Sequence, residues 1–168
     1  MSTSRTRRPD IAVVPAVGLL GTLTAARADL DAAARRAAES LGLPLGLVTV
    51  LLDDRQVVVG AAGFGAAGLP TLDSAAGWEF CANAARRSGP FISPDTGRDP
   101  RRSPHAALRT DGLRSFAAVP LCDDGCPVLG ALAVAGVRPR WIGQDAVDRL
   151  RGLAALTMLE LRRDHGLV

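Results

Sequence analysis

The sequence predicts an α+β fold in which an antiparallel sheet lies between helical layers. Apolar residues recur at helical spacing near both ends of the sequence, over about 22–41 and 143–163. Between them, two pairs of short apolar segments, within 45–63 and 113–136, are each joined by turn-forming residues. Segments joined by such tight turns pair as antiparallel hairpins, so the two pairs predict most of the sheet.

Composition limits the classes of function. A chain of 168 residues with 48% hydrophobic and 22% charged residues is sufficient for one domain with a real core. The net charge of +3 does not favour nucleic-acid binding, which needs a concentrated basic face. No stretch approaches the ~20 apolar residues that a membrane span requires, so no membrane is expected.

Three cysteines, an odd number, do not fit a secreted disulfide framework, and we expect a cytoplasmic protein. A secretory leader is the alternative for the stretch RTRRPDIAVVPAVGLLGTLTAARA, but Asp10 and Pro15 flank or interrupt its apolar part. We therefore interpret residues 1–18 as a disordered basic tail and lead-in, followed by one domain over 19–164.

The first predicted helix covers about Thr22 to Leu41 and is stopped by Gly42 and Pro44. Two strands follow, LGLVTVLLDD and RQVVVGAAG, which turn at Asp53 and Asp54. We expect a flexible glycine-rich connection over 60–69. The apolar positions of the helix are Leu23, Ala26, Leu30, Ala33, Ala37 and Leu41.

The middle of the sequence is less regular. A helix capped by Asp73 or Ser74 runs to about Ser88, and PFIS predicts a short strand. The proline-punctuated residues 94–111 predict a loop with a short helix near 104–108.

LRSFAAVPL and PVLGALAVAG predict two strands on either side of the turn CDDGC. Their near-continuous apolar character favours a sheet covered on both faces. The last helix, about 143–163, ends before Gly166 and is apolar on two sides, so it needs two partners. We expect one partner to be the sheet and the other to be the same helix of a second chain, in a homodimer through the terminal helices.

Three stretches, EFCANAARRSGPFISPDTGRDPR, GLRSFAAVPL and GCPVLGALAVAGVRPR, together with the closing helix, resemble a GAF domain. Such domains are small-molecule sensors of bacterial signalling proteins, and the likeness covers about 19–163. The resemblance implies a GAF/PAS-like antiparallel sheet of five to six strands between helical layers. It also implies a ligand pocket on one face, walled by about 91–108.

We expect the ligand to contact residues in and near this wall. Seven arginines against three aspartates between Arg86 and Arg114 favour an anionic ligand, such as a nucleotide or small acid. The alternative is a solvated surface with internal Asp–Arg pairs, such as Asp99 with Arg102. The expected ligand-binding residues are Phe91, Ser93, Asp95, Arg98, Arg101, Arg114 and Phe116.

The sequence around the three cysteines favours a structural role over a reactive or metal-binding one. Cys81 is expected in the core, while Cys122 and Cys126 flank a turn and form a poor zinc site, so no metal is predicted. A redox role for Cys81, Cys122 and Cys126 is the alternative. Haem bound through His105 and a covalent bilin are not expected, because His105 has no motif around it and no Cys-His pair is present.

The predicted function is that of a GAF-like sensor or adaptor that acts in trans on a signalling partner such as a kinase or regulator. No output module is recognisable in these 168 residues. One alternative is a thiol-dependent enzyme of the free-methionine-sulfoxide reductase type, although its catalytic cysteines do not match those here. The other is an interaction subunit whose pocket is filled by its own side chains.

Overall fold

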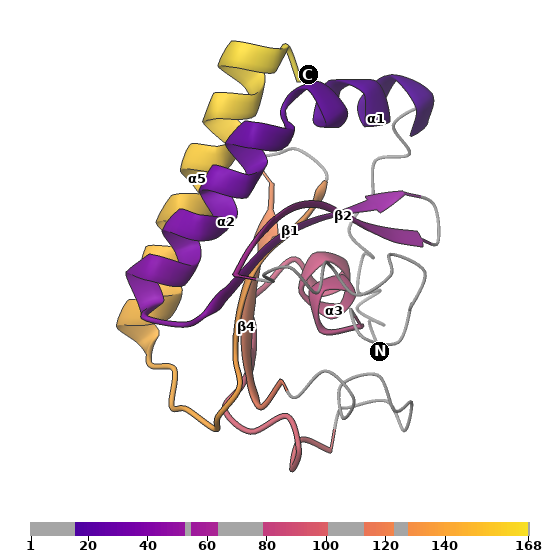
Figure 1. Ribbon diagram of the computed structural model, residues 1–168. Coiled ribbons are helices and arrows are strands. Elements are labelled where there is room, and N and C mark those ends of the chain that lie inside the picture. Colours follow the sequence, from indigo (N-terminus) through magenta and orange to yellow (C-terminus); the bar gives the residue numbers. More distant parts are fainter. Residues whose placement is uncertain (1–15, 53–54, 64–78, 101–112, 123–127, 168) are drawn as a thin grey trace, which may run out of the picture.

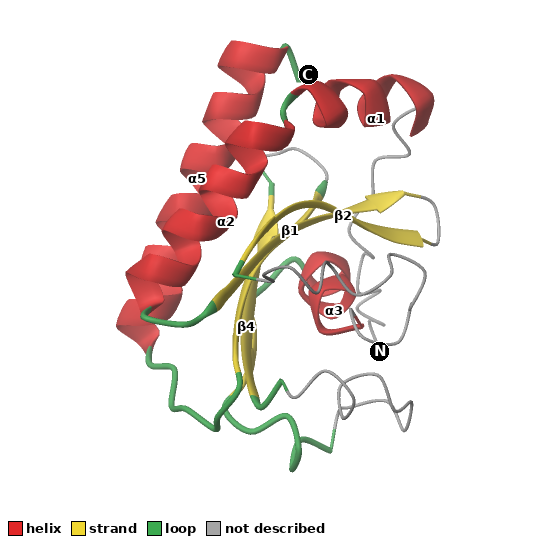
Figure 2. Ribbon diagram, viewed as in Figure 1, coloured by secondary structure: helices red, strands yellow, loops and turns green. Residues whose placement is uncertain are grey.

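The computed structural model describes residues 16–52, 55–63, 79–100, 113–122 and 128–167. Their strands form one five-stranded sheet in the order β2-β1-β5-β4-β3, in which all neighbours are antiparallel. Figures 1 and 2 show this sheet between helical layers. This confirms the predicted α+β class. The strands are β1 (Leu45–Leu52), β2 (Arg55–Ala62), β3 (Phe91–Ser93), β4 (Ser115–Leu121) and β5 (Gly130–Gly136). The helices are α1 (Ala16–Ala25), α2 (Arg27–Leu41), α3 (Glu79–Arg87) and α5 (Gln144–His165).

The N-terminal helical segment differs from the prediction. Helix begins at Ala16, inside the expected lead-in, and Ala26 separates α1 from α2 with φ −84° and ψ 5°. Leu19 and Leu23 are buried, so this earlier start is held by packing. All six apolar positions predicted for the helix are nevertheless buried. As predicted, α2 ends at Gly42, which adopts a left-handed φ of 62°.

Two other boundaries need correction. The strand β2 ends at Ala62, close to the end of the predicted strand RQVVVGAAG, so residues 60–62 belong to the sheet and not to the flexible connection expected over 60–69. The final helix begins at Gln144 and ends at His165, two residues later than predicted. The predicted start of the helix before Ser88, the short helix near 104–108 and the CDDGC turn lie wholly or largely outside the described residues.

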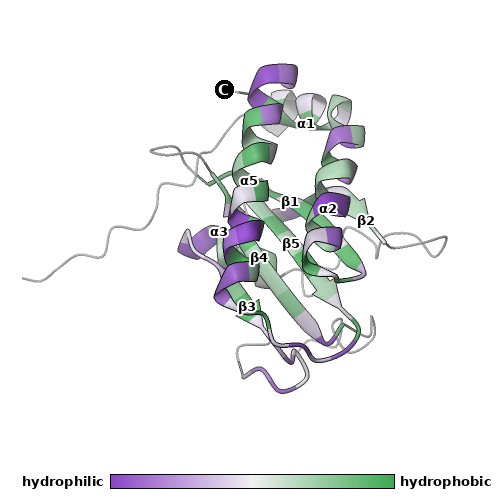
Figure 3. Cartoon of the chain, turned by 90° about the vertical axis from the view of Figure 1, so that its left-hand side faces the viewer, coloured by the Kyte–Doolittle hydropathy of each residue, from purple (hydrophilic) through white to green (hydrophobic). Residues whose placement is uncertain are grey.

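One face of the sheet is covered by α2 and α5, which lie side by side across the strands (Figure 3). The helix α2 packs closely on β1 and β2, because Gly46 and Gly60 present no side chain to it. Asp31 of α2 accepts a hydrogen bond at 2.8 Å from the backbone N–H of Ala61. This face therefore has both apolar contact and a polar connection between helix and sheet.

The two apolar sides of α5 pack on β4 and on α2 of the same chain. The second partner is therefore α2, and the expectation that the same helix of another chain covers this side is wrong. An ion pair between Arg36 and Glu160, 2.7 Å apart, and a contact of 2.7 Å between His165 and Asp29 join α5 to α2. The leucines Leu156 and Leu159 stay 40% and 59% exposed. None of the described helices is both long and apolar enough to cross a membrane.

Candidate functional site

The opposite face of the sheet is covered by α3 and forms a second apolar cluster. Phe91 of β3 and Phe116 of β4 are buried there beside Cys81 of α3. Alternate residues of β4 and β5 supply short side chains, which make this face flat. These are Ala118, Ala131, Ala133 and Ala135.

A small polar group lies within this apolar face. The side-chain amide of Gln56 donates to the hydroxyl of Thr49 at 2.9 Å, and that hydroxyl donates to the carbonyl of Ala131 at 3.4 Å. Burial raises the pKa of the Cys81 thiol from 9.0 to about 12, and hydrogen bonds with Thr49 and Gln56 offset part of this shift. At neutral pH Cys81 is therefore a protonated thiol and a poor nucleophile.

Ser93 lies at the other end of this face, in the edge strand β3. It alternates with Ile92, which packs on the opposite core, so its side chain shares the face of Phe91. Ser93 is fully buried, and its hydroxyl has no hydrogen-bond partner among the described residues. A buried polar group without a hydrogen bond costs about 1–3 kcal/mol of stability. Such groups in native proteins usually have a partner, so we expect one for this hydroxyl.

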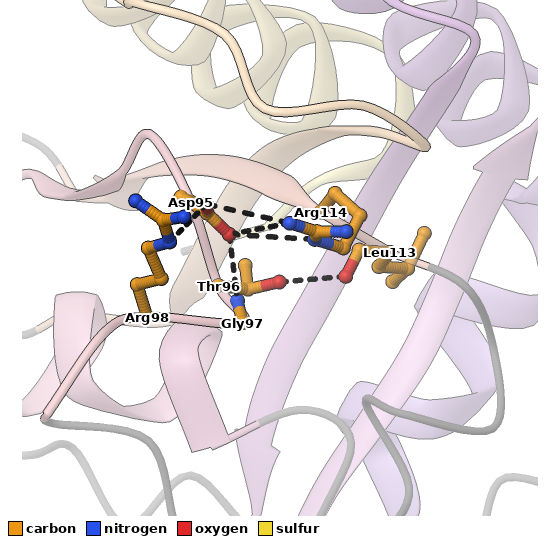
Figure 4. Close-up of polar contacts among 6 residues, drawn as sticks. All are labelled: Asp95, Thr96, Gly97, Arg98, Leu113 and Arg114. Carbon is orange, nitrogen blue, oxygen red and sulfur yellow. Dashed lines mark hydrogen bonds and ion pairs between the residues drawn. The ribbon is translucent and has the colours of Figure 1, made fainter.

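The turn that follows β3 is organised by Asp95 (Figure 4). Its carboxylate accepts hydrogen bonds from Arg114 at 3.2 and 3.3 Å and from the backbone N–H of Gly97 at 3.0 Å. Arg98 lies 3.8 Å from the same carboxylate, with its side chain 89% exposed. Thr96 is buried and donates to the carbonyl of Leu113 at 2.6 Å, which fixes the turn against the start of β4.

The expected ligand-binding residues thus fall into two groups. Phe91, Ser93 and Phe116 are brought together on the buried face under α3. Asp95, Arg98 and Arg114 form an ion-pair group at the more exposed turn. Arg101 lies outside the described residues.

Only some of the candidate redox and metal-binding residues lie within the described part of the chain. Cys81 is buried and Cys122 is half-buried after β4, while Cys126 and His105 lie outside the described residues. No group of three metal-ligating side chains occurs within the described ranges. The redox expectation for the pair flanking the CDDGC turn therefore stays a prediction.

Thr49 and Gln56 were not predicted as site residues. Each is a polar residue in an otherwise apolar strand segment, LVTVLL and RQVVV, and this is the signal that sequence offers. Their contact depends on the β1–β2 register, in which Thr49 pairs with Val58 and Leu51 with Gln56.

Comparisons with known proteins agree with this architecture. The model of the GAF domain family matches residues 27–160. No curated protein sequence matches the chain. Among solved structures, the blue-light absorbing form of the PixJ GAF domain of Thermosynechococcus elongatus has a TM-score of 0.68 at 21% identity, covering 88% of this chain and 90% of that one.

Two further similar structures come from enzymes with different activities. The GAF domain of a phosphoenolpyruvate-protein phosphotransferase of Coxiella burnetii has a TM-score of 0.67 at 18% identity, covering 92% of this chain and 100% of that one. A type II free methionine-R-sulfoxide reductase of Thermoplasma acidophilum has a TM-score of 0.64 at 16% identity, covering 84% and 95%. At such identities the likeness establishes the fold alone. Since the family model spans most of the sequence and the sheet and helices have the same arrangement, the chain belongs to the GAF domain family.

Proposed function

We propose that this GAF domain is a cytoplasmic small-molecule sensor or adaptor of signal transduction that acts on a partner protein such as a kinase or regulator, and not by catalysis. GAF domains bind small molecules and are typical of signalling sensors. The observation that carries the proposal is the buried hydroxyl of Ser93, which has no partner among the described residues. A ligand on the face under α3 would supply that hydrogen bond.

The surroundings of Ser93 favour a mainly apolar, flat ligand with one or two polar groups. The four alanines of β4 and β5 offer a flat apolar floor, and the Thr49–Gln56 pair offers polar atoms toward its far side. Pockets of this composition use a few placed polar groups to orient an otherwise apolar ligand. Binding would favour one arrangement of the face over another and so alter the contact with the partner.

The charge of the ligand depends on the arginines. Arg114 already binds Asp95, and this pairing uses much of its capacity for an external anion. The prediction of an anionic ligand therefore depends on Arg98, which is largely exposed, and on Arg101.

A specific observation also favours the ligand-free interaction subunit. Phe91 and Phe116 are both buried on the face where the ligand would bind. Side chains that fill this face would make it a core and leave the protein to act through its surface alone.

The thiol-dependent enzyme is the weaker candidate. A nucleophilic cysteine needs a lowered pKa and access to solvent, whereas Cys81 has a raised pKa and is fully buried. If purified protein reduces free methionine sulfoxide with a thiol reductant, and Cys122→Ser or Cys126→Ser abolishes the activity, the non-enzymatic proposal fails.

We further propose a homodimer through the terminal helices. Leu20 of α1 and Leu156 and Leu159 of α5 are exposed apolar side chains on these helices. Burying them against a second copy would remove apolar surface from water, the main favourable term in association.

Native mass spectrometry of the purified protein, with a thermal-shift screen of small molecules, tests the sensor proposal. We expect a bound molecule, or a compound that raises Tm, whose affinity falls about tenfold in Ser93→Ala because one buried hydrogen bond is lost. Ser115→Ala is the matched control, because its hydroxyl is also buried without a partner among the described residues but belongs to the opposite face. Absence of any bound molecule or thermal shift would favour the interaction subunit.

A further inference from the structure

The connection between β5 and α5 exposes large apolar side chains. Trp141 is 82% exposed and Val137 is 57% exposed. Tryptophan is on average among the more buried residues, and this chain has only two of them. Packing in the core of this chain therefore does not explain why a tryptophan stands at this position.

Trp141 lies beside the Asp95 turn. The backbone N–H of Arg140 donates to the carbonyl of Pro94 at 2.9 Å, and that of Arg114 donates to the carbonyl of Gly136 at 2.8 Å. The segments after β3 and after β5 therefore run together at one end of the sheet (Figure 1). We name the side chains of Arg98, Val137, Arg138 and Trp141 the Trp141 surface.

The charge of this surface is positive and small. Arg98 pairs with Asp95 only at 3.8 Å and keeps its side chain 89% exposed. Arg138 is exposed and makes no ion pair in the part of the chain that the structure describes. Two neighbouring arginines are already engaged, since Arg140 donates to the carbonyl of Gly42 at 2.8 Å and Arg114 binds Asp95. Arg138, and Arg98 beyond its long 3.8 Å pair with Asp95, are therefore the guanidinium groups of this surface that remain open to a partner.

We propose that the Trp141 surface docks an acidic segment of a partner protein, with an apolar side chain against Trp141 and carboxylates on Arg98 and Arg138. Tryptophan and arginine are the residues that most often dominate protein interfaces. Guanidinium groups match carboxylates with two parallel hydrogen bonds.

A protein segment fits better than a membrane or a nucleic acid. Recognition of an anionic membrane surface takes clusters of about 4–8 basic residues. Nucleic-acid binding similarly depends on many phosphate contacts, about 6–10 in strong cases. Two available arginines are enough for one or two carboxylates and too few for a polyanion.

This inference deepens the proposed action on a partner protein and rests on it. The test is to select short random peptides displayed on phage against the wild-type protein. Binding of synthetic versions that carry a fluorescent label is then measured by anisotropy, which can be read for every variant, including Trp141→Ala. A Trp78→Phe background leaves Trp141 as the only tryptophan. We expect selected peptides to combine acidic and apolar residues, to shift the Trp141 emission to shorter wavelength, and to bind more weakly at high salt.

Trp141→Ala and Arg138→Glu should each weaken binding about tenfold or more. Arg163→Glu is the control, because Arg163 is an exposed arginine near the other end of α5. Both test positions are exposed, so unchanged Tm values will show that the variants fold.

Three outcomes overturn the inference. If the selected peptides bind Trp141→Ala and Arg138→Glu with the affinity of the wild type, the protein binds a partner segment, but at another surface. Binding to vesicles rich in phosphatidylserine or to single-stranded DNA that is lost in the same variants would assign the surface to a polyanion. Failure to select any peptide would count against both the surface and the proposed action on a partner.

Discussion

Arg36 of α2 donates a hydrogen bond to Glu160 of α5, with Nη2 and Oε2 2.7 Å apart. The pair joins two helices on the same face of the sheet and is partly buried. The Nε of Arg36 is buried without a partner among the described residues, and Glu160 is the acidic group that pairs with this guanidinium there. We expect Glu160→Ala to lower the free energy of unfolding by about 1–2 kcal/mol, measured by urea denaturation.

The neighbouring Arg35 gives a control, because it is exposed on the same helix. Arg35→Ala should change stability by about 0.5 kcal/mol or less. In a double-mutant cycle with Arg36→Ala, we expect a coupling of about 0.5–1 kcal/mol. Strictly additive losses would show that the ion pair contributes nothing.

Gly46 of β1 lies where α2 crosses the sheet. A Cβ atom at this position would overlap the backbone carbonyl of Ala34, and backbone cannot move aside as a flexible side chain can. We expect Gly46→Ala to destabilise the protein by about 2–3 kcal/mol or more, seen as a lower midpoint in urea.

Gly152 provides the opposite case. It is exposed within α5, and a Cβ atom added there would have open space within 4 Å around it. Gly152→Ala should stabilise by about 0.5–1 kcal/mol, because alanine favours the helix. Equal effects of the two substitutions would contradict the close contact between α2 and β1.

The layers of this fold could be predicted because the spacing of apolar residues shows which faces of each helix and strand are buried. In β4, Ala117 and Val119 pack under α2 and α5, while Phe116 and Ala118 face α3, as a strand apolar on both sides implies. The break at Ala26 could not be predicted in this way, because alanine is the strongest helix former and marks no boundary.

The site was less predictable, because its contacts depend on strand register. Asp95 and Arg114 are 19 residues apart and meet because β3 pairs with β4. Both residues were expected near the ligand, but their pairing with each other depends on that register. The contact of Thr49 with Gln56 similarly follows from the β1–β2 pairing, in which Thr49 lies opposite Val58 and Gln56 opposite Leu51.

The proposed homodimer makes Leu159 a test position. It is the most exposed leucine on α5, at 59%, and a charge there would be buried in a dimer interface but solvated in a monomer. We expect Leu159→Arg to convert the dimer into a monomer, as measured by analytical ultracentrifugation. Val137→Arg, a similarly exposed apolar position outside the helices, should leave the dimer intact. A wild-type protein that is already monomeric would contradict the proposal.

Cys81 gives the protein a defined response to alkaline pH. Its pKa is raised by burial from 9.0 to about 12, so below about pH 9 the thiol is protonated in both folded and unfolded chains. Above that pH the unfolded chain loses the proton while the folded chain keeps it. The free energy of unfolding therefore falls with rising pH, by up to about 1.4 kcal/mol per unit, until the folded thiol itself ionises.

This chain suits the measurement, because it has no lysine and no tyrosine to titrate in the same range. Urea denaturation of wild type and Cys81→Ala at about pH 8 and about pH 10 isolates the thiol, since alanine cannot ionise. The stability advantage of wild type over Cys81→Ala should shrink across this interval, while Cys122→Ala, at a half-buried position, should follow the wild-type slope more closely. Parallel slopes for wild type and Cys81→Ala would mean that the thiol is not held protonated in the folded state, and Cys81 would then regain its place as a candidate nucleophile.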